Sequence, residues 1–198
     1  MMNKKQLQST QTKKRILEAS KELFIKKGYA ATSIEEISDI TGFSKGNIYY
    51  HFKSKEGLFL DMLDEWEVDW ADKWEIKKQK YTTTIEKLYG LAEHLVEDEF
   101  NHPLTNVADE FYTSEKSNSE VHERLQKSFN GRIQFCQQLL LDGMNSDEFK
   151  QHDSLRLAKI LDGMVNGLSY TCRDLDLKET LLIYKEAIDV LLYGFAKR

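Results

Sequence analysis

The sequence predicts an all-α protein of about nine helices, in which a small N-terminal head precedes a longer helical body. Apolar residues recur with the 3.6-residue period of an amphipathic helix along almost the whole chain. Capping boxes and glycines separate these segments from one another. No stretch keeps the apolar–polar alternation of a half-buried strand, and the 198 residues include a single proline.

Composition excludes several classes of protein. Hydrophobic residues make up 40% of the chain and charged residues 31%, as in ordinary globular domains. No apolar run approaches the ~20 residues of a membrane-spanning helix, and the first residues lack the apolar core of a secretion signal. Cys136 and Cys172 have neither C-x-x-C nor metal-ligand spacing, so we expect reduced, buried thiols in a cytoplasmic protein without cofactors.

Charge is distributed unevenly along the chain. Residues 1–58 hold eleven basic and six acidic residues, a net charge of +5, while the remainder carries −10 and the whole chain −5. A basic head on an acidic body predicts that the head meets a polyanion such as nucleic acid. Chance scatter of charge is the alternative.

Helix start and stop signals are closely spaced in the head. Gly28 is placed to end a first helix, and Gly42 a second. Ser33 with Glu36 forms a capping box before the second helix, and Ser44 caps the third. Three short helices joined by a tight glycine-containing turn have the size of a helix-turn-helix unit. The predicted helices span residues 12–27, 34–41 and 45–52.

The third of these helices has an unusual outer face. Ile48 and Phe52 are its apolar positions, and a rotation of 100° per residue turns most other side chains away from them. Glycine inside a helix costs about 1 kcal/mol relative to alanine, which a merely structural helix would avoid. Lysine, tyrosine and asparagine reach phosphates and base edges, so this face predicts DNA binding; packing on a neighbouring domain is the alternative. The outward residues are Gly46, Asn47, Tyr49 and Tyr50, with Lys45 and His51 at the flanks.

Six further helices are predicted in the body. Ser54 caps the first of them, and Thr83 with Glu86 and Ser117 with Glu120 form capping boxes before two others. We therefore expect a helix-turn-helix DNA-binding domain over 1–54 and a second domain over 55–198. The predicted body helices span residues 55–79, 84–100, 103–115, 118–143, 154–172 and 178–196.

An ordered set of motif residues extends from Ile16 to Leu63 and includes the segment KKGYAATSIEEISDITGFSKGNIYYHFKSKEGLF. In order and spacing this stretch resembles the DNA-binding head of the TetR family of bacterial transcriptional regulators. The tryptophan spacing that follows and the segment HPLTNVADEFYT resemble the QacR-like, multidrug-binding branch of that family. The resemblance implies a helical, non-enzymatic regulator that binds double-stranded DNA.

The resemblance also implies which head residues touch DNA. Thr32 and Ser33 would cap the second helix and donate to phosphates. Lys55 would contact a phosphate beside the N-terminus of the fourth helix. The residues from Ser44 to His51 in the list below would form the recognition surface. Phe43 replaces the small polar residue of related proteins, so we expect it to pack against the first helix. The implied DNA-binding residues are Thr32, Ser33, Ser44, Lys45, Gly46, Asn47, Tyr49, Tyr50, His51 and Lys55.

The family places an inducer pocket beneath the fourth helix, walled by the middle helices. Aromatic residues with a few carboxylates would suit a flat, apolar aromatic ligand, whose charge is left open between neutral and cationic. Core packing of the tryptophans and a solvated face for the carboxylates are the alternatives. The candidate ligand-binding residues are Trp66, Trp70, Glu99, His102, Asn106, Glu110, Tyr112, Phe129 and Asn166.

The last two predicted helices are apolar over more than one stripe. Such breadth predicts burial on two sides, by the helix's own domain and by a partner. In the family these helices form a homodimer interface. Gly163 and Gly167, four residues apart, could allow close approach of helices there, or they could pack inside one subunit.

Catalytic motifs are scarce. Glu99 and His102 have the Glu-x-x-His spacing of di-iron bundles, but those need two copies and two further glutamates. No H-E-x-x-H, P-loop or G-x-S-x-G motif occurs. The sequence therefore predicts a homodimeric, ligand-responsive repressor that binds a palindromic DNA operator and is released by a small-molecule inducer. A DNA-binding regulator without an effector, or an all-α enzyme or interaction bundle, are the alternatives.

Overall fold

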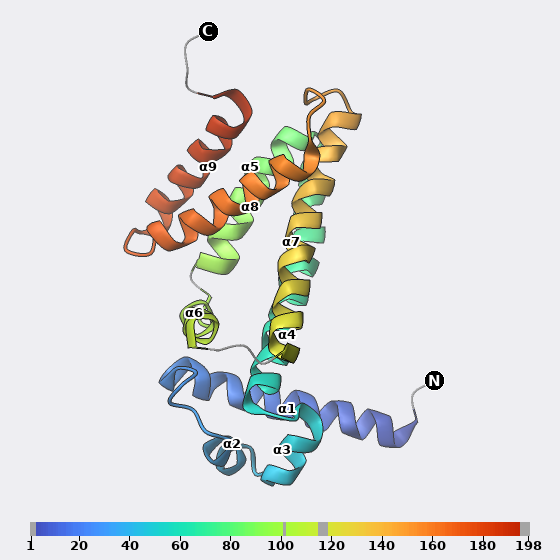
Figure 1. Ribbon diagram of the computed structural model, residues 1–198, viewed down its shortest axis with the longest axis vertical. Coiled ribbons are helices and arrows are strands. Elements are labelled where there is room, and N and C mark those ends of the chain that lie inside the picture. Colours follow the sequence, from blue (N-terminus) through green and yellow to red (C-terminus); the bar gives the residue numbers. More distant parts are fainter. Residues whose placement is uncertain (1–2, 101, 115–118, 195–198) are drawn as a thin grey trace. The chain divides into compact units, whose positions relative to one another are not determined.

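The computed structural model describes residues 3–100, 102–114 and 119–194, and every regular element within these ranges is helical (Figure 1). This confirms the all-α prediction. No helix in the described ranges is long and apolar enough to cross a membrane. The elements are α1 Lys4–Lys27, α2 Ile34–Thr41, α3 Lys45–Phe52, α4 Lys55–Lys77, the 3₁₀ helix η1 Lys78–Lys80, α5 Thr84–Leu95, the π-helix η2 Val96–Phe100, α6 Thr105–Ser114, α7 Ser119–Asn145, α8 Ser154–Thr171 and α9 Leu177–Tyr193.

Local capping signals set several of these bounds. The Ser33 hydroxyl accepts a hydrogen bond from the Glu36 N–H at 3.2 Å, and the Glu36 carboxylate accepts one from the Ser33 N–H at 3.0 Å. Thr83 and Glu86 form the same box before α5. Gly42 ends α2 with a φ of 71°, in the left-handed region that glycine adopts without strain. All three predicted signals are confirmed.

The starts of α1, α6 and α7 differ from the prediction or cannot be compared with it. α6 begins at Thr105, two residues after the predicted start at 103. α1 begins at Lys4, eight residues before the expected start, because Asn3 and Gln6 form a capping box that adds two turns. α7 begins at Ser119, and its predicted capping residue, Ser117, lies outside the described residues.

The chain forms two compact units. The first comprises Met1–Asp69 and Pro103–Arg124, and the second comprises Trp70–His102 and Leu125–Arg198. Helix α6 therefore shares a unit with the three head helices, although the sequence separates them by more than fifty residues.

Four aromatic rings form the centre of the first unit. Phe24, Tyr29, Phe59 and Phe111 have neighbouring ring centroids 4.8–6.0 Å apart, and each side chain is at most 3% exposed. Burying one such ring contributes about 1.5–3 kcal/mol. Because Phe111 belongs to α6, this cluster attaches α6 to the head.

The second unit buries its own core between α5, α7, α8 and α9. Leu161 and Ile188 lie in this core, and Cys136 is buried with them. Burial raises the pKa of the Cys136 thiol to about 12, so the thiol stays protonated. Cys172 is also buried and free, which confirms the prediction of two unpaired thiols. No group of three or more metal-ligating side chains occurs in the described part of the chain.

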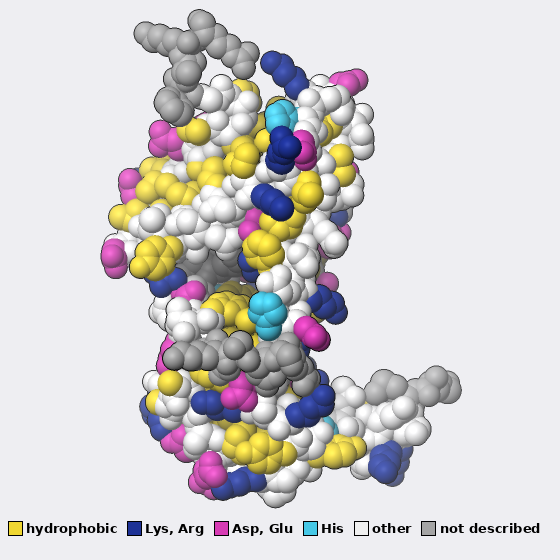
Figure 2. Space-filling view, in the orientation of Figure 1, with side chains coloured by type: hydrophobic (Ala, Val, Ile, Leu, Met, Phe, Trp, Pro, Cys, Tyr) yellow, Lys and Arg dark blue, Asp and Glu magenta, His cyan; other side chains and the backbone are white. Residues whose placement is uncertain are grey.

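Large apolar side chains remain exposed along α8 and α9, and Figure 2 shows hydrophobic side chains gathered over these two helices. A methyl group added at Gly163 or Gly167 would meet no atom within 4 Å. Packing within the described subunit therefore requires neither glycine. The exposed apolar residues are Leu155, Ile160, Tyr170, Leu177, Leu182, Val190 and Tyr193.

Candidate DNA-binding surface and effector region

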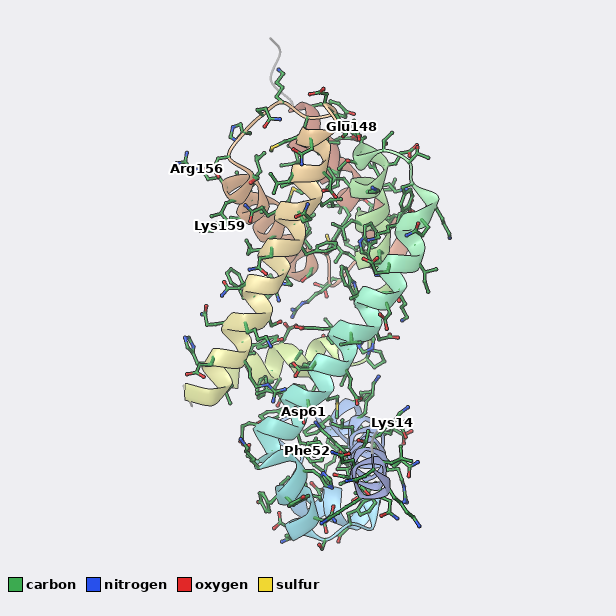
Figure 3. All side chains as sticks on the ribbon, turned by 90° about the vertical axis from the view of Figure 1, so that its right-hand side faces the viewer. Lys14, Phe52, Asp61, Glu148, Arg156 and Lys159 are labelled. Carbon is green, nitrogen blue, oxygen red and sulfur yellow. The ribbon has the colours of Figure 1, made fainter. Side chains whose placement is uncertain are left out.

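Helix α3 has one buried and one exposed face. Ile48 is fully buried and Phe52 is 3% exposed, and Figure 3 shows Phe52 among the side chains of the head. Tyr49 and Tyr50 are 49% and 77% exposed. The inward positions of Ile48 and Phe52 and the outward positions of the two tyrosines are as predicted, whereas the side-chain oxygen of Asn47, which was also predicted to point outward, is buried. The two tyrosines offer rings for packing and hydroxyls for hydrogen bonds to a partner.

Gly46 lies on the exposed face without a structural requirement for glycine. A methyl group built on it would come no closer than 3.9 Å to another side chain, the Ser44 hydroxyl. The glycines with positive φ in the described chain are Gly28, Gly42 and Gly194, so the Gly46 backbone is not strained. Since glycine weakens a helix interior by about 1 kcal/mol relative to alanine, close approach of an outside surface best accounts for it.

The polar residues beside Gly46 are arranged at the start of α3. Ser44 caps the helix by accepting a hydrogen bond from the Asn47 N–H at 3.3 Å. The side-chain oxygen of Asn47 has no partner among the described residues. Lys45 donates to the carboxylate of Glu35 on α2, and this bond lowers the pKa of Glu35.

The hydroxyls of Thr32 and Ser33 are engaged within the protein. Thr32 is 1% exposed, and its hydroxyl donates to the Gly28 carbonyl at 2.8 Å. The Ser33 hydroxyl donates to the Glu36 carboxylate at 3.1 Å. The first-turn N–H groups of α2, which lie next to both residues, are the donors that a helix N-terminus offers to an anion.

Lys55 is also bonded inside the first unit. Its ammonium group donates to the carbonyls of Tyr29 at 3.0 Å and Thr32 at 3.1 Å, and it lies 4.2 Å from the centre of the Tyr29 ring. Two of its three N–H donors are therefore used in holding the turn between α1 and α2. One donor is left for the phosphate contact that was predicted.

Basic residues of α1 flank α3, and the sequence did not single them out. The Arg15 guanidinium lies 5.2 Å from the centre of the Phe43 ring, which confirms that Phe43 packs against the first helix. Lys13 lies 5.7 Å from the Phe52 ring. Burial, together with the charge of Lys13, lowers the pKa of His51. Residues 13–15 are three consecutive basic residues, and this run is the sequence signal from which the basic flank could have been predicted.

The tryptophans of α4 differ in burial. Trp74 is 3% exposed and belongs to the core, whereas Trp66 and Trp70 are half-buried. The Trp70 ring lies 4.8 Å from the imidazole of His94 and 5.6 Å from the Phe135 ring. The Trp70 indole N–H has no acceptor among the described residues. Trp70 therefore keeps a hydrogen-bond donor beside an aromatic surface.

Two of the predicted ligand residues have partners of their own. The Glu110 carboxylate accepts hydrogen bonds from the backbone N–H groups of Tyr29 and Ala30, at 2.7 and 3.0 Å. The Asn166 amide donates to the Asp162 carbonyl of its own helix at 2.7 Å. Glu110 was expected in the inducer wall, and its carboxylate bonds the backbone of the turn between α1 and α2.

The other predicted ligand residues are divided between the units. Asn106, Tyr112, Phe129 and Asn166 are exposed, and His102 is half-buried. The side chain of Glu99 lies outside the described residues. The first unit holds Trp66, Asn106, Glu110 and Tyr112, and the second holds Trp70, His102, Phe129 and Asn166.

The second unit has an open groove of about 300 Å³. One side is formed by the C-terminal end of α4 and by η1, and the other side by α7. Aromatic rings and charges of both signs line it. The predicted ligand residues do not lie in its wall. The lining residues include Trp74, Glu75, Lys78, Tyr81, Phe135 and Asp142.

Two protein-family models match the chain. Residues 16–62 match the family described as bacterial regulatory proteins of the tetR family. Residues 66–197 match the family described as the C-terminal region of QacR-like proteins. The chain belongs to the TetR family. This TetR-family protein is therefore a helix-turn-helix transcriptional regulator and not an enzyme.

Individual relatives agree with this assignment. The transcriptional regulator QacR of Staphylococcus aureus is 34% identical over 185 residues, which cover 93% of this chain and 98% of the relative. The fatty acid metabolism regulator protein of Bacillus subtilis is 25% identical over 145 residues, covering 73% of this chain and 74% of the relative.

Solved structures share the fold of this TetR-family chain. FadR of Bacillus subtilis, in complex with stearoyl-CoA, has a TM-score of 0.77 at 19% identity and covers 92% of this chain and 98% of its own. A TetR regulator of Haloarcula marismortui has a TM-score of 0.78 at 19% identity and covers 92% of this chain and 99% of its own.

Proposed function

We propose that this TetR-family regulator is a ligand-responsive repressor, which binds a palindromic operator as a homodimer and releases it when a small apolar inducer binds. The outer face of α3 carries the argument. There, Gly46 is exposed between polar residues although the protein's own packing requires no glycine. A helix face that lets its backbone approach closely and offers tyrosine and lysine beside it suits the major groove.

The operator contacts fall on the head. Tyr49 and Tyr50 are exposed beside Gly46, and Lys45 is exposed at the start of the same helix. We assign direct contacts to Ser44, Lys45, Gly46, Asn47, Tyr49, Tyr50 and His51. We assign the start of α2 at Thr32 and Ser33, and the remaining donor of Lys55, to phosphates.

The homodimer is placed on α8 and α9. Their exposed apolar side chains, such as Ile160 and Leu182, would be covered by the same helices of a second subunit. Two subunits related by a two-fold axis read a palindrome. In functional terms residues 1–54, together with Lys55 at the start of α4, hold the DNA surface, and the rest of residues 55–198 holds the dimer and inducer surfaces.

The inducer is placed beside Trp70. Its half-buried indole stands against other rings and keeps an unused N–H donor, which suits a flat aromatic ligand with a hydrogen-bond acceptor. A cationic charge was argued from Glu99 and Glu110, and Glu110 bonds the backbone of the head instead. The preference for a cation therefore loses one of its two supports.

The switch is tested with matched pairs of aromatic compounds, such as 1-methylquinolinium and its uncharged parent quinoline, on the full chain. Tryptophan fluorescence reports binding, and fluorescence anisotropy reports affinity for an operator selected from random DNA. We expect quenching by the binding compound together with a 5- to 150-fold loss of operator affinity, which is a coupling of roughly 1–3 kcal/mol. Quenching without loss of operator affinity would favour a regulator that has no small-molecule switch.

A further inference from the structure

The carboxylate of Glu110 on α6 binds the backbone of the turn between α1 and α2. One carboxylate oxygen accepts from the Tyr29 N–H at 2.7 Å and the other from the Ala30 N–H at 3.0 Å. The approach is close, since a methyl group on Gly28 would lie 2.6 Å from the first of these oxygens. A bidentate, charged acceptor on two successive N–H groups fixes the orientation of both peptide planes.

Lys55 of α4 binds the carbonyl groups of the same turn. Its ammonium donates to the carbonyls of Tyr29 and Thr32, at 3.0 and 3.1 Å. The N–H groups of the turn are thus bound by the carboxylate of Glu110 on α6, and its C=O groups by the ammonium of Lys55 on α4. The Tyr29 ring packs on Phe111, the residue next to Glu110, with centroids 4.8 Å apart.

The turn determines where α2 begins. Thr32 bonds back to the Gly28 carbonyl, and Ser33 is the N-cap of α2. The first-turn N–H groups of α2 therefore take their position from this turn, and α3 follows α2 after the Gly42 turn. A shift of the turn would move the anion-binding end of α2 relative to a bound DNA backbone.

We propose that Glu110 is a positioning residue for operator binding: it touches no DNA, and its carboxylate sets the start of α2 through the peptide groups of Tyr29 and Ala30. This role rests on the operator binding proposed above. This role differs from the one that the family resemblance implied for Glu110, which was a place in the inducer wall. The partners lie 81 and 80 residues away along the chain.

A matched control exists in the second unit. Glu148 accepts hydrogen bonds from the N–H groups of Thr84 and Ile85, at 2.8 and 3.0 Å, at the start of α5. Glu110→Gln and Glu148→Gln each replace one acceptor oxygen with an NH₂ group that cannot accept, in nearly the same geometry. Both variants should lose similar thermal stability, but only the first alters the head.

The full-length variants are compared with the wild type on an operator selected from random DNA, by fluorescence anisotropy across a salt series. We expect Glu110→Gln to lower operator affinity about tenfold and to reduce the slope of log K against log salt by about 1.8, the loss of one phosphate contact in each of the two subunits. Glu148→Gln should leave both quantities unchanged. Should Glu110→Gln not fold, Glu110→Asp, which keeps the charge but is one carbon shorter, is measured against the same criteria.

Two results separate this role from the function on which it rests. Wild-type affinity and slope in the Glu110 variant, or an equal loss in both variants, would overturn the positioning role and leave operator binding intact. Failure of the wild type to select any DNA would overturn the proposed function, and the role of Glu110 with it.

Discussion

Lys45 of α3 and Glu35 of α2 form an ion pair across the two helices of the helix-turn-helix, with both side chains exposed. The bond from Lys45 lowers the pKa of Glu35, so the carboxylate is ionised at neutral pH. A DNA phosphate that approaches Lys45 therefore meets a negative charge, which it has to displace. We expect this competition to limit operator affinity.

The first prediction concerns that pair. Glu35→Gln should raise operator affinity several-fold at low salt, because the competing charge is gone, and Lys45→Ala should lower it about tenfold. Anisotropy titrations over a salt series measure both, and Lys45→Ala should reduce the salt slope by about 1.8, because each of the two subunits loses one phosphate contact. Thermal stability should hardly change, since exposed ion pairs contribute little. Lys127→Ala, at an exposed lysine of α7, is the control, and weaker binding by Glu35→Gln would contradict the competition.

The second prediction concerns Gly46. Alanine fits there without any contact closer than 3.9 Å, so Gly46→Ala should raise the free energy of unfolding by up to about 1 kcal/mol. The same methyl group should weaken operator binding at least tenfold, because it holds the backbone away from DNA. Gly131→Ala on α7 is the matched control, since a methyl group there also meets nothing within 4 Å. Unchanged operator affinity in Gly46→Ala would show that the glycine has no role at the interface.

The third prediction separates the two faces of α3. Tyr49→Ala should weaken operator binding and leave stability nearly unchanged, because the ring is 49% exposed. Phe52→Ala should destabilise the chain by about 3–5 kcal/mol, since the ring is 3% exposed in the core of the head. Urea unfolding and operator titration of both variants provide the test. Unfolding by Tyr49→Ala would mean that the helix is oriented differently.

The fourth prediction is a pH dependence of stability from His94. Its ring is 1% exposed, with Nε2 3.0 Å from the Trp70 carbonyl and Nδ1 2.8 Å from Asp98. Burial lowers the pKa of His94 below its ordinary 6.5, against the opposing effect of these two acceptors. The unfolded chain then binds more protons than the folded one as the pH falls through 6.5, so stability decreases toward acid.

Urea unfolding between pH 8 and pH 5 measures this effect. The free energy of unfolding should fall less steeply in His94→Gln than in the wild type, because glutamine does not titrate. His122→Gln, at an exposed position of α7, should keep the wild-type slope. Identical slopes in the wild type and His94→Gln would remove His94 as the cause.

Local signals account for what the sequence predicted well. The capping box of Ser33 and Glu36 and the stop at Gly42 depend on residues within four positions of each other, so the pattern alone determines them. The early start of α1 was also local, since Asn3 and Gln6 form a box of a less common residue pair. The N-terminal region was judged on its apolar period, which is weak there.

Long-range partners account for what the sequence missed. Glu110 was assigned to the inducer wall from the family resemblance, yet its acceptor oxygens meet N–H groups about eighty residues earlier. Lys55 was assigned to DNA from the same resemblance, and two of its donors hold that turn. Packing of α6 with the head brings Glu110 to the turn.

The most direct test of the repressor assignment is the DNA that the full-length protein selects from a random library, combined with the number of subunits bound to it. We expect a palindrome whose half-sites lie one helical turn, roughly 34–36 Å, or a multiple of this distance apart, bound by an even number of subunits. A single subunit on a site without repeated half-sites would contradict it.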